Sequence, residues 1–308
     1  MLEAALIASR DSIAKITLIG EESKIKETAK ANKLELPKIE YLSSRRYEKL
    51  PELASIYATK RKITIEEATT EICEHDLLFA ALLAKTGRVD GVLGGSFSTT
   101  AQVVRAALRG IGTADGVSVL SSLFLMYFPA MGDYRPKELL IGFGDCSVIP
   151  DPTDVQLADI ARSSAATFHS LTGEIPRVAL LSFSTKGSAL TESTEKVLRA
   201  LAIIKKSSPE LIIDGELQFD AAFVPDVAAR KAPDSPVAGR ANIFIFPDLD
   251  AGNIGYKIAE RLGMGQAIGP VMQGLAVPMN DLSRGAHVSD IVNMIAITAL
   301  QTVQTSQP

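Results

Sequence analysis

The feature that most constrains the fold is a regular alternation of short apolar runs with longer segments of helical pattern. Continuous apolar runs are typical of strands that are buried on both faces of a sheet. Because helical segments separate these runs, we expect an α/β fold with two domains and mostly parallel sheets that carry helices on both faces. The expected strands span residues 15–19, 91–93, 117–128, 138–143, 178–183, 211–214 and 243–246. The expected helices include residues 22–32, 47–60, 65–86 and 290–304.

The longest expected helix of the first half spans residues 65–86. Its apolar side chains recur at helical spacing, for example at Ala68, Ile72 and Phe79. His75 falls on the same face, so we expect it to be a core histidine.

The chain length indicates more than one domain. At 308 residues, the chain exceeds the size of an average domain. We expect a first domain of residues 1–118 plus 271–308 and a second domain of residues 119–270.

Charge and composition exclude several classes of function. The net charge is −4 and no basic run stands out, which argues against nucleic-acid and membrane-surface partners. The start has no signal-peptide pattern, and no apolar stretch is long enough for a transmembrane span. Cys73 and Cys146, the only cysteines, lack a disulfide or metal-ligand pattern, which favours a cytoplasmic protein.

Polar, glycine-containing segments follow several of the expected strands. They span residues 94–100, 182–188, 247–253 and 280–285. In an open α/β sheet, ligands bind at the carboxyl ends of the strands, where such loops lie. The last segment supplies the hydroxyl of Ser283 and the guanidinium of Arg284, and the carboxylate of Asp290 follows shortly after. These three groups suit the handling of a phosphate beside a reacting carbonyl.

Several blocks of sequence resemble the phosphotransacetylase (phosphate acetyltransferase) family. The most specific are Asp214-Gly-Glu-Leu-Gln-Phe-Asp-Ala-Ala222, Ala229-Arg-Lys-Ala-Pro-Asp-Ser-Pro-Val-Ala-Gly239 and Asn280-Asp-Leu-Ser-Arg-Gly285. The resemblance implies reversible transfer of an acetyl group between coenzyme A (CoA) and inorganic phosphate. It also implies a fold akin to the isocitrate and isopropylmalate dehydrogenases, an active site in the interdomain cleft, and a homodimer.

The resemblance also implies roles for the three C-terminal groups. Asp290 would be the base toward the CoA thiol, Ser283 would stabilise the oxyanion, and Arg284 would hold the phosphate. A structural alternative remains for each. Ser289 stands at a position typical of an N-cap, with Asp290 in the first helical turn. The Ser-Arg-Gly segment can be an ordinary turn before a helix.

Three further arginines match family positions and can bind the phosphates of CoA, although Arg61 stands among three consecutive basic residues, which are usually a solvated face. These arginines are Arg61, Arg105 and Arg261. From their positions on the loops that follow the expected strands, we also expect supporting contacts from Asn253, Ser182, Thr185 and Asn280.

Two departures from the family pattern carry expectations. Ala286 stands where a cysteine is expected after Ser-Arg-Gly, which favours direct transfer without an acyl-enzyme. The chain also begins where family members have passed a first strand, so we expect that strand to be short or missing.

The sequence favours no cofactor other than CoA as a substrate. Neither a dinucleotide fingerprint nor a Walker-type loop occurs. Asp248 and Asp250 lack a third metal ligand nearby, so we expect no metal site.

Three other functions stay open. The enzyme can prefer propionyl or butyryl groups, because one methylene changes binding by only about 1–3 kcal/mol. The chain can be a non-catalytic domain that senses acetyl-CoA. A metal- and NAD-dependent dehydrogenase of the same expected fold is disfavoured, because the aspartate cluster and nucleotide loop are missing.

Overall fold

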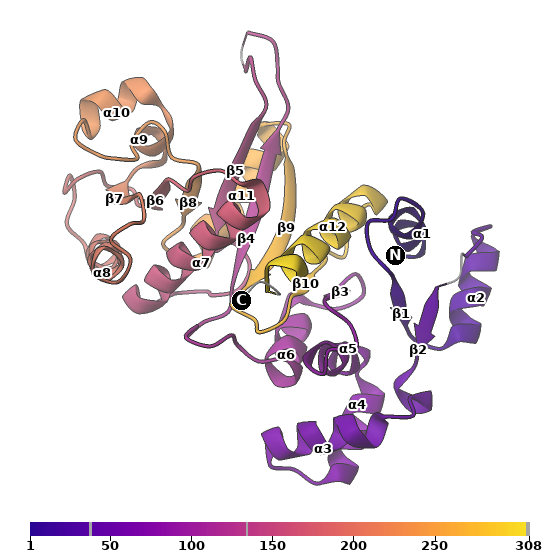
Figure 1. Cartoon of the computed structure of the whole chain (residues 1–308). Helices are drawn as coiled ribbons and strands as arrows, with labels where there is room; N and C mark the ends of the chain where they lie inside the picture. The colour runs from indigo at the N-terminus through magenta and orange to yellow at the C-terminus, as the bar shows by residue number, and fades with distance from the viewer. Residues whose placement is uncertain (37–38, 134, 306–308) are drawn as a thin grey trace. The chain divides into compact units, whose positions relative to one another are not determined.

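The computed structural model describes residues 1–36, 39–133 and 135–305. The chain folds into two compact units (Figure 1). Unit 1 is discontinuous and comprises Met1–Ala114 and Leu275–Pro308, whereas unit 2 is the continuous segment Asp115–Gly274.

Unit 2 is built on a six-stranded sheet with the strand order β7-β6-β8-β5-β4-β9. Its strands are β4 (Ser121–Phe128), β5 (Leu139–Gly144), β6 (Val178–Leu181), β7 (Ile213–Leu217), β8 (Ile243–Ile245) and β9 (Gln266–Gln273). Its helices are α7 (Asp154–Thr172), α8 (Glu192–Ser207), α9 (Phe219–Phe223), α10 (Pro225–Lys231) and α11 (Leu249–Leu262). Strands β7, β6, β8 and β5 run parallel to one another, whereas β4 is antiparallel to both β5 and β9.

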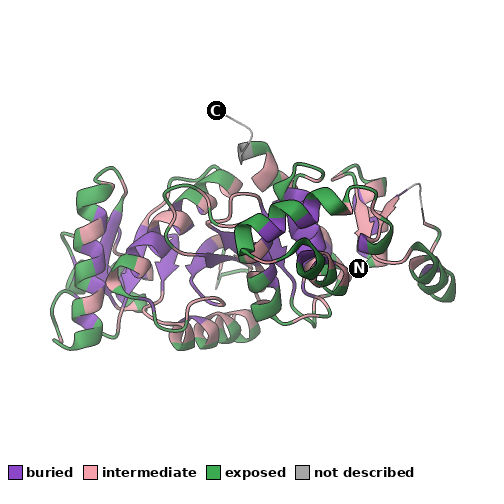
Figure 2. Ribbon diagram, turned by 90° about the horizontal axis from the view of Figure 1, so that it is seen from below, coloured by how far each residue is buried: buried purple, intermediate pink, exposed green. Residues whose placement is uncertain are grey.

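Helices cover both faces of this sheet. On one face, Phe124, Met126 and Phe244 pack in a core with side chains of α9, α10 and α11. On the other face, the long helix α7 contacts β4, β5, β6 and β8, and α8 contacts β6 and β7. Figure 2 shows the strands of the sheet as largely buried. An α/β fold with mostly parallel sheets is therefore confirmed, although its largest sheet contains antiparallel pairs.

In unit 1, the described residues form two small parallel sheets and a larger number of helices. Its strands are β1 (Thr17–Ile19), β2 (Glu40–Leu42), β3 (Val92–Gly94) and β10 (Met279–Asp281). Its helices are α1 (Leu2–Arg10), α2 (Glu22–Ala31), the 3-10 helix η1 (Ser44–Arg46), α3 (Leu50–Arg61), α4 (Ile65–Glu74), α5 (Asp76–Lys85), α6 (Thr100–Gly110) and α12 (Val288–Thr305). Strand β1 pairs with β2, and β3 pairs with β10.

The expected helix over residues 65–86 is wrong, because two helices, α4 and α5, occupy this segment. His75 separates them with extended backbone angles of φ −129° and ψ 92°. Its side chain is exposed, so the expectation of a core histidine is also wrong. The apolar spacing continues across the break because both helices pack on the same core, which includes Ile72 and Phe79.

Strand β9 is absent from the sequence-based expectations because Gly269-Pro270 interrupts its apolar pattern. A proline is tolerated at the edge of a sheet, where one side of the strand has no ladder partner. β9 is such an edge strand. Its pairing with β4 shifts register between Leu123 and Leu125, opposite these two residues.

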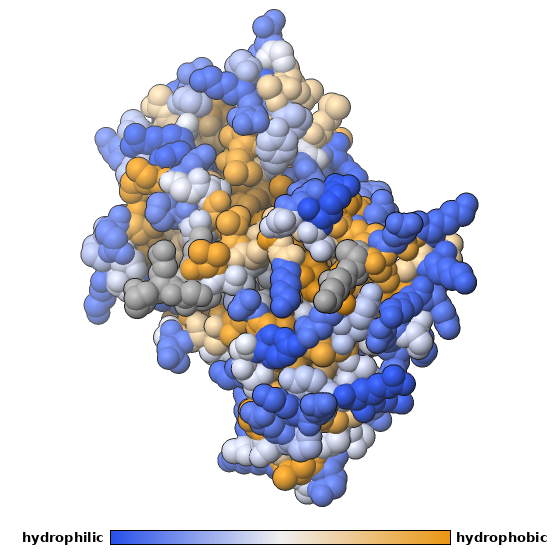
Figure 3. All heavy atoms as spheres, turned by 45° about the vertical axis from the view of Figure 1, so that its right-hand side comes forward, coloured by the Kyte–Doolittle hydropathy of each residue, from blue (hydrophilic) through white to orange (hydrophobic). Residues whose placement is uncertain are grey.

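No described helix is long and apolar enough to cross a membrane. On the face that Figure 3 shows, hydrophilic and apolar side chains are intermixed.

Candidate functional site

The connection between β10 and α12 in unit 1 carries three candidate groups. Strand β10 is buried, and so is Leu282 after it, at 2% exposure. The chain then reaches the surface, where the side chains of Ser283 and Arg284 are exposed. Two hydrogen bonds fold this connection into a turn: Ala286 N donates to Ser283 O at 3.0 Å, and Gly285 N donates to Ser283 Oγ at 3.3 Å. A buried strand therefore presents a hydroxyl and a guanidinium to solvent at its carboxyl end.

Asp290 lies in the first turn of α12 and caps that helix. Its Oδ2 accepts a hydrogen bond of 2.9 Å from the backbone N–H of His287, the residue that precedes the helix. The expected N-cap, Ser289, is wrong because it already lies inside α12. The structure thus shows the helix-capping function that was the structural alternative to a catalytic function of Asp290. It does not exclude a second function, because an ionised carboxylate accepts several hydrogen bonds.

Asn280 lies in the middle of β10 and is fully buried. Its Nδ2 donates to Thr298 Oγ1 at 2.8 Å and to Gln301 Oε1 at 2.7 Å. Both acceptors belong to α12. The amide group of Asn280 therefore fastens the helix that carries Asp290 to the strand that precedes Ser283.

Two of the candidate arginines belong to other helices of unit 1. Arg105 is exposed on α6, which follows β3 and the polar loop over residues 95–99. Arg61 is exposed at the last position of α3. Both guanidinium groups are open to solvent, as contacts to a phosphate would require.

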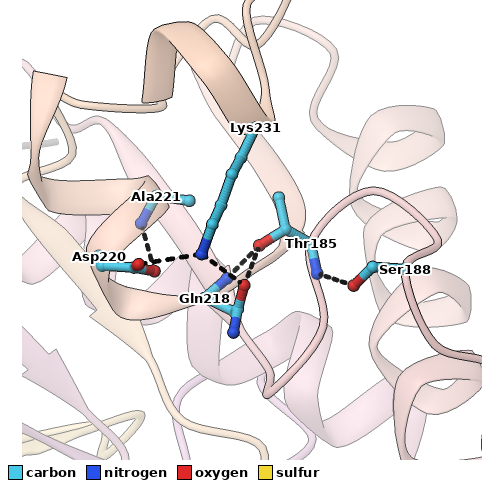
Figure 4. A network of polar contacts seen from close by, with 6 residues as sticks. All are labelled: Thr185, Ser188, Gln218, Asp220, Ala221 and Lys231. Atoms are coloured by element: carbon cyan, nitrogen blue, oxygen red, sulfur yellow. Dashed lines mark hydrogen bonds and ion pairs between the residues drawn. The ribbon is translucent and has the colours of Figure 1, made fainter. Parts of the chain in front are cut away.

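In unit 2, the loop after β6 is held by hydrogen bonds to β7 and to the residue after it. The Oγ1 of Thr185 donates to Gln218 Oε1 at 3.2 Å and accepts from Gln218 N at 2.9 Å. Lys231 Nζ reaches the same Gln218 Oε1 at 3.0 Å, and Figure 4 shows this network. Ser182 donates its backbone N–H to Leu217 O at 2.9 Å. Thr185 is buried and Ser182 is half-buried, so these side chains shape the loop.

Two carboxylates of β7 also hold this loop. Glu216 is 1% exposed, and its Oε1 accepts from Ser184 Oγ and from Gly187 N, each at 2.8 Å. Asp214 accepts from Lys186 Nζ at 2.6 Å. Burial raises the pKa of Asp214, but the hydrogen bonds from Lys186, Ser235 and the backbone of Gly215, together with the charge of Lys186, outweigh burial, so the pKa is lowered.

Helix α11 follows β8 and carries the remaining candidates. Asp248 caps its start, where Asp248 Oδ1 accepts from Ala251 N at 2.8 Å. Asn253 Nδ2 donates to Cys146 O at 3.1 Å. Arg261 is exposed in the last turn, with its Nε 3.7 Å from the Oε2 of Glu260. Asp248 thus has an architectural function, and no group of three or more possible metal ligands occurs among the described residues.

The candidates are therefore divided between the two units, with Arg61, Arg105, Asn280, Ser283, Arg284 and Asp290 in unit 1 and Ser182, Thr185, Asn253 and Arg261 in unit 2. Ser283, Arg284 and Asp290 are brought together by a single turn and the helix that follows it. Sequence reasoning missed Asp281, a buried carboxylate at the end of β10, although it stands inside the block used for the resemblance. A charged residue directly before the apolar Leu282, at the end of a strand, was the available signal.

Comparisons with known proteins agree on one family. Residues 1–299 match the family model described as phosphate acetyl/butaryl transferase. A phosphate acetyltransferase of Clostridium acetobutylicum is 45% identical over 295 residues, which cover 95% of this chain and 88% of that protein. A phosphotransacetylase structure from Streptococcus pyogenes is 39% identical with a TM-score of 0.90, covering 98% of this chain and 90% of that one. A 4-hydroxythreonine-4-phosphate dehydrogenase of Klebsiella pneumoniae, with 11% identity, a TM-score of 0.55 and coverage of 96% and 91%, shares the fold alone.

Proposed function

This chain belongs to the phosphate acetyl/butaryl transferase family and has phosphate acetyltransferase activity, and from that premise we propose the groups that carry out the transfer. Asp290 takes the proton of the CoA thiol, Ser283 donates a hydrogen bond to the carbonyl oxygen as it gains charge, and Arg284 holds the phosphate. The observation that carries this proposal is the turn that exposes Ser283 and Arg284 directly before the helix of Asp290.

The proposed step is a direct transfer. The thiolate sulfur of CoA attacks the carbonyl carbon of acetyl phosphate, so a C–S bond forms and the C–O bond to phosphorus breaks. The thiol proton passes to Asp290, and phosphate leaves with the electron pair of the broken bond. In the opposite direction, a phosphate oxygen attacks the thioester and the thiolate takes the proton back.

Neither cysteine favours a covalent acyl-enzyme. Burial raises the pKa of the Cys146 thiol well above its usual value, and the side chain is inaccessible. Cys73 lies half-buried in α4. The residue after Ser-Arg-Gly is Ala286. These positions support the proposal that CoA and the acetyl donor react with each other without an intermediate on the protein.

Proton transfer from an ordinary thiol to an ordinary carboxylate is uphill by about 6 kcal/mol. Fast turnover therefore requires nearby cations that stabilise the thiolate. We propose that Arg105, Arg61 and Arg261 bind the phosphates of CoA and that Asn253, Ser182, Thr185 and Asn280 support these contacts.

The first test is the reaction itself. With purified protein, acetyl-CoA should release free thiol only when phosphate or arsenate is added. Equal concentrations of acetyl-, propionyl- and butyryl-CoA should give the fastest release with acetyl-CoA. Similar rates for all three would indicate a phosphate acyltransferase without a preference for acetyl groups. Tight binding of acetyl-CoA without thiol release would favour a sensing domain. Thiol release that does not depend on phosphate would contradict the proposal.

We propose a cytoplasmic homodimer, and α11 is the surface that supports it. Ile254, Ile258 and Leu262 follow one another at a spacing of four residues and are 57%, 52% and 82% exposed. Such a continuous apolar stripe on a helix is typical of an interaction surface.

Replacing Leu262 by glutamate should therefore convert the dimer to a monomer. A charge placed in an apolar interface lacks a partner and costs several kcal/mol. Light scattering after size-exclusion chromatography measures the mass, and Leu108→Glu, at an apolar position of α6 that is 40% exposed, is the control. A wild-type monomer at micromolar concentration would contradict the dimer.

A further inference from the structure

Asp281 is a buried carboxylate that the proposed reaction does not use. It is the last residue of β10 and only 2% exposed. Its Oδ2 accepts a hydrogen bond of 2.6 Å from the hydroxyl of Thr100, a residue 181 positions away in the sequence. Its Oδ1 is buried and has no hydrogen-bond partner among the residues that the structure describes.

The free oxygen lies against the backbone of another loop. Gly95 follows β3 and has a φ of +108°, which favours glycine. A Cβ atom at Gly95 would lie 2.1 Å from Asp281 Oδ1 and 2.8 Å from Leu282 N. The loop after β3 therefore packs directly on the carboxylate, and no larger residue fits at this contact.

Folding stability alone does not explain a carboxylate at this position. Burial raises the pKa of Asp281, while the hydrogen bond from Thr100 and the nearby amide of Leu282 oppose that shift. Burying an ionised carboxylate with one unpartnered oxygen lowers the stability of the fold. An asparagine would accept the same hydrogen bond from Thr100 without a buried charge.

The position of Asp281 in the chain indicates a function for its carboxylate. Two residues later comes Ser283, the first exposed side chain of the turn. On the other side of the hydrogen bond, Thr100 begins α6, the helix of Arg105. Asp281 therefore connects the two segments of unit 1 that carry Ser283, Arg284 and Arg105.

We propose that Asp281 is a positioning residue for acetyl transfer, which fixes the Ser283–Arg284 turn relative to the start of α6 through Thr100 and Gly95. The inference rests on the proposed function of that turn. Misplacement of a reacting group by about 1 Å can lower a rate 100-fold. Loosening this connection should therefore affect the rate of transfer more than the binding of CoA.

The test removes the hydrogen bond without changing side-chain volume. Thr100→Val should lower kcat about 10- to 100-fold and leave the KM for CoA within about twofold of the wild type. Thr100→Ser, which keeps the hydroxyl, should recover most of kcat. The matched control is Thr69→Val on α4, where the hydroxyl bonds only to Ile65 O of its own helix. Unchanged kcat in folded Thr100→Val would overturn the proposal.

A second variant separates positioning from stability. Asp281→Leu removes the buried charge and the acceptor of the Thr100 hydrogen bond at similar side-chain volume, so its Tm should stay close to that of the wild type, whereas its kcat should fall about 10-fold or more. A purely structural carboxylate would instead give a lower Tm with unchanged kcat per folded molecule, and that result would contradict the proposal.

A third measurement does not depend on activity. Hydrogen–deuterium exchange of the peptide over residues 282–287 should become faster in Thr100→Val than in Thr69→Val, because the turn is less restrained. Equal exchange in both variants would overturn the positioning function. A wild-type protein without phosphate-dependent thiol release would contradict the proposed reaction instead, whatever the exchange result.

Discussion

Replacing Asp290 by asparagine should lower kcat by about 10²- to 10⁴-fold, the usual contribution of general acid–base catalysis. The KM for CoA should change little, because the amide keeps the size of the side chain and still accepts a hydrogen bond. Steady-state rates with acetyl phosphate and CoA measure both parameters. We expect kcat to fall without a change in KM because the carboxylate accepts the thiol proton only as the reaction proceeds.

The capping function of Asp290 requires a matched control. Glu67 occupies the equivalent position at the start of α4, where its Oε2 accepts from Thr64 N at 2.9 Å. The bond from His287 N to Asp290 has the same length. Glu67→Gln and Asp290→Asn should therefore lower Tm by similar, small amounts, since an exposed cap contributes about 1 kcal/mol. Only Asp290→Asn should lower kcat. A large drop in Tm with unchanged kcat per folded molecule would make Asp290 a helix cap alone.

Replacing Arg284 by alanine should raise the KM for acetyl phosphate or phosphate by about 10- to 100-fold, since charge-assisted hydrogen bonds contribute about 1.5–3 kcal/mol. The KM for CoA should change much less. Arg284→Lys should recover only part of the affinity, because an ammonium group lacks the planar fork that binds two phosphate oxygens. Initial rates over a grid of both substrates measure the two constants.

Arg261 provides the contrasting variant for that experiment. Arg261→Ala should raise the KM for CoA more than the KM for acetyl phosphate, and Arg45→Ala, an exposed arginine of η1, should change neither. If Arg284→Ala instead affected mainly CoA, Arg284 would belong to the CoA-binding groups. If Arg261→Ala affected neither substrate, the proposal that Arg261 binds CoA would be contradicted.

Part of the fold was predictable because some strands, such as β6 and β8, are short and continuously apolar. The strands expected around residues 178–183 and 243–246 are confirmed within two residues as β6 and β8. Boundaries and breaks were less predictable. The split at His75 depends on backbone angles at one residue, and both flanking helices keep the same apolar spacing because they share a core. β9 was missed because an edge position tolerates a glycine and a proline.

The sequence likewise predicted only part of the candidate site. The sequence identified Ser283, Arg284 and Asp290 because they are close together in the chain and match a family pattern. It assigned nothing to Asp281, because the contacts that define this residue come from Thr100 and Gly95, far away in the sequence. A contact between distant segments leaves no periodic signal, so only the three-dimensional structure reveals it. The N-cap at Ser289 was wrong by two residues for a different, local reason, because the carboxylate of Asp290 reaches back to His287.

The discontinuity of unit 1 has a consequence for biosynthesis. β3 lies in the first third of the chain, yet its partner β10 and the helix α12 are near the C-terminus. A nascent chain can complete unit 2 while the ribosome still holds the last segment, but the apolar surfaces around β3, α5 and α6 must wait for it. We therefore expect the early part of unit 1 to be the main target of chaperones during translation. Chains that terminate before β10 should be degraded even though their larger sheet is complete.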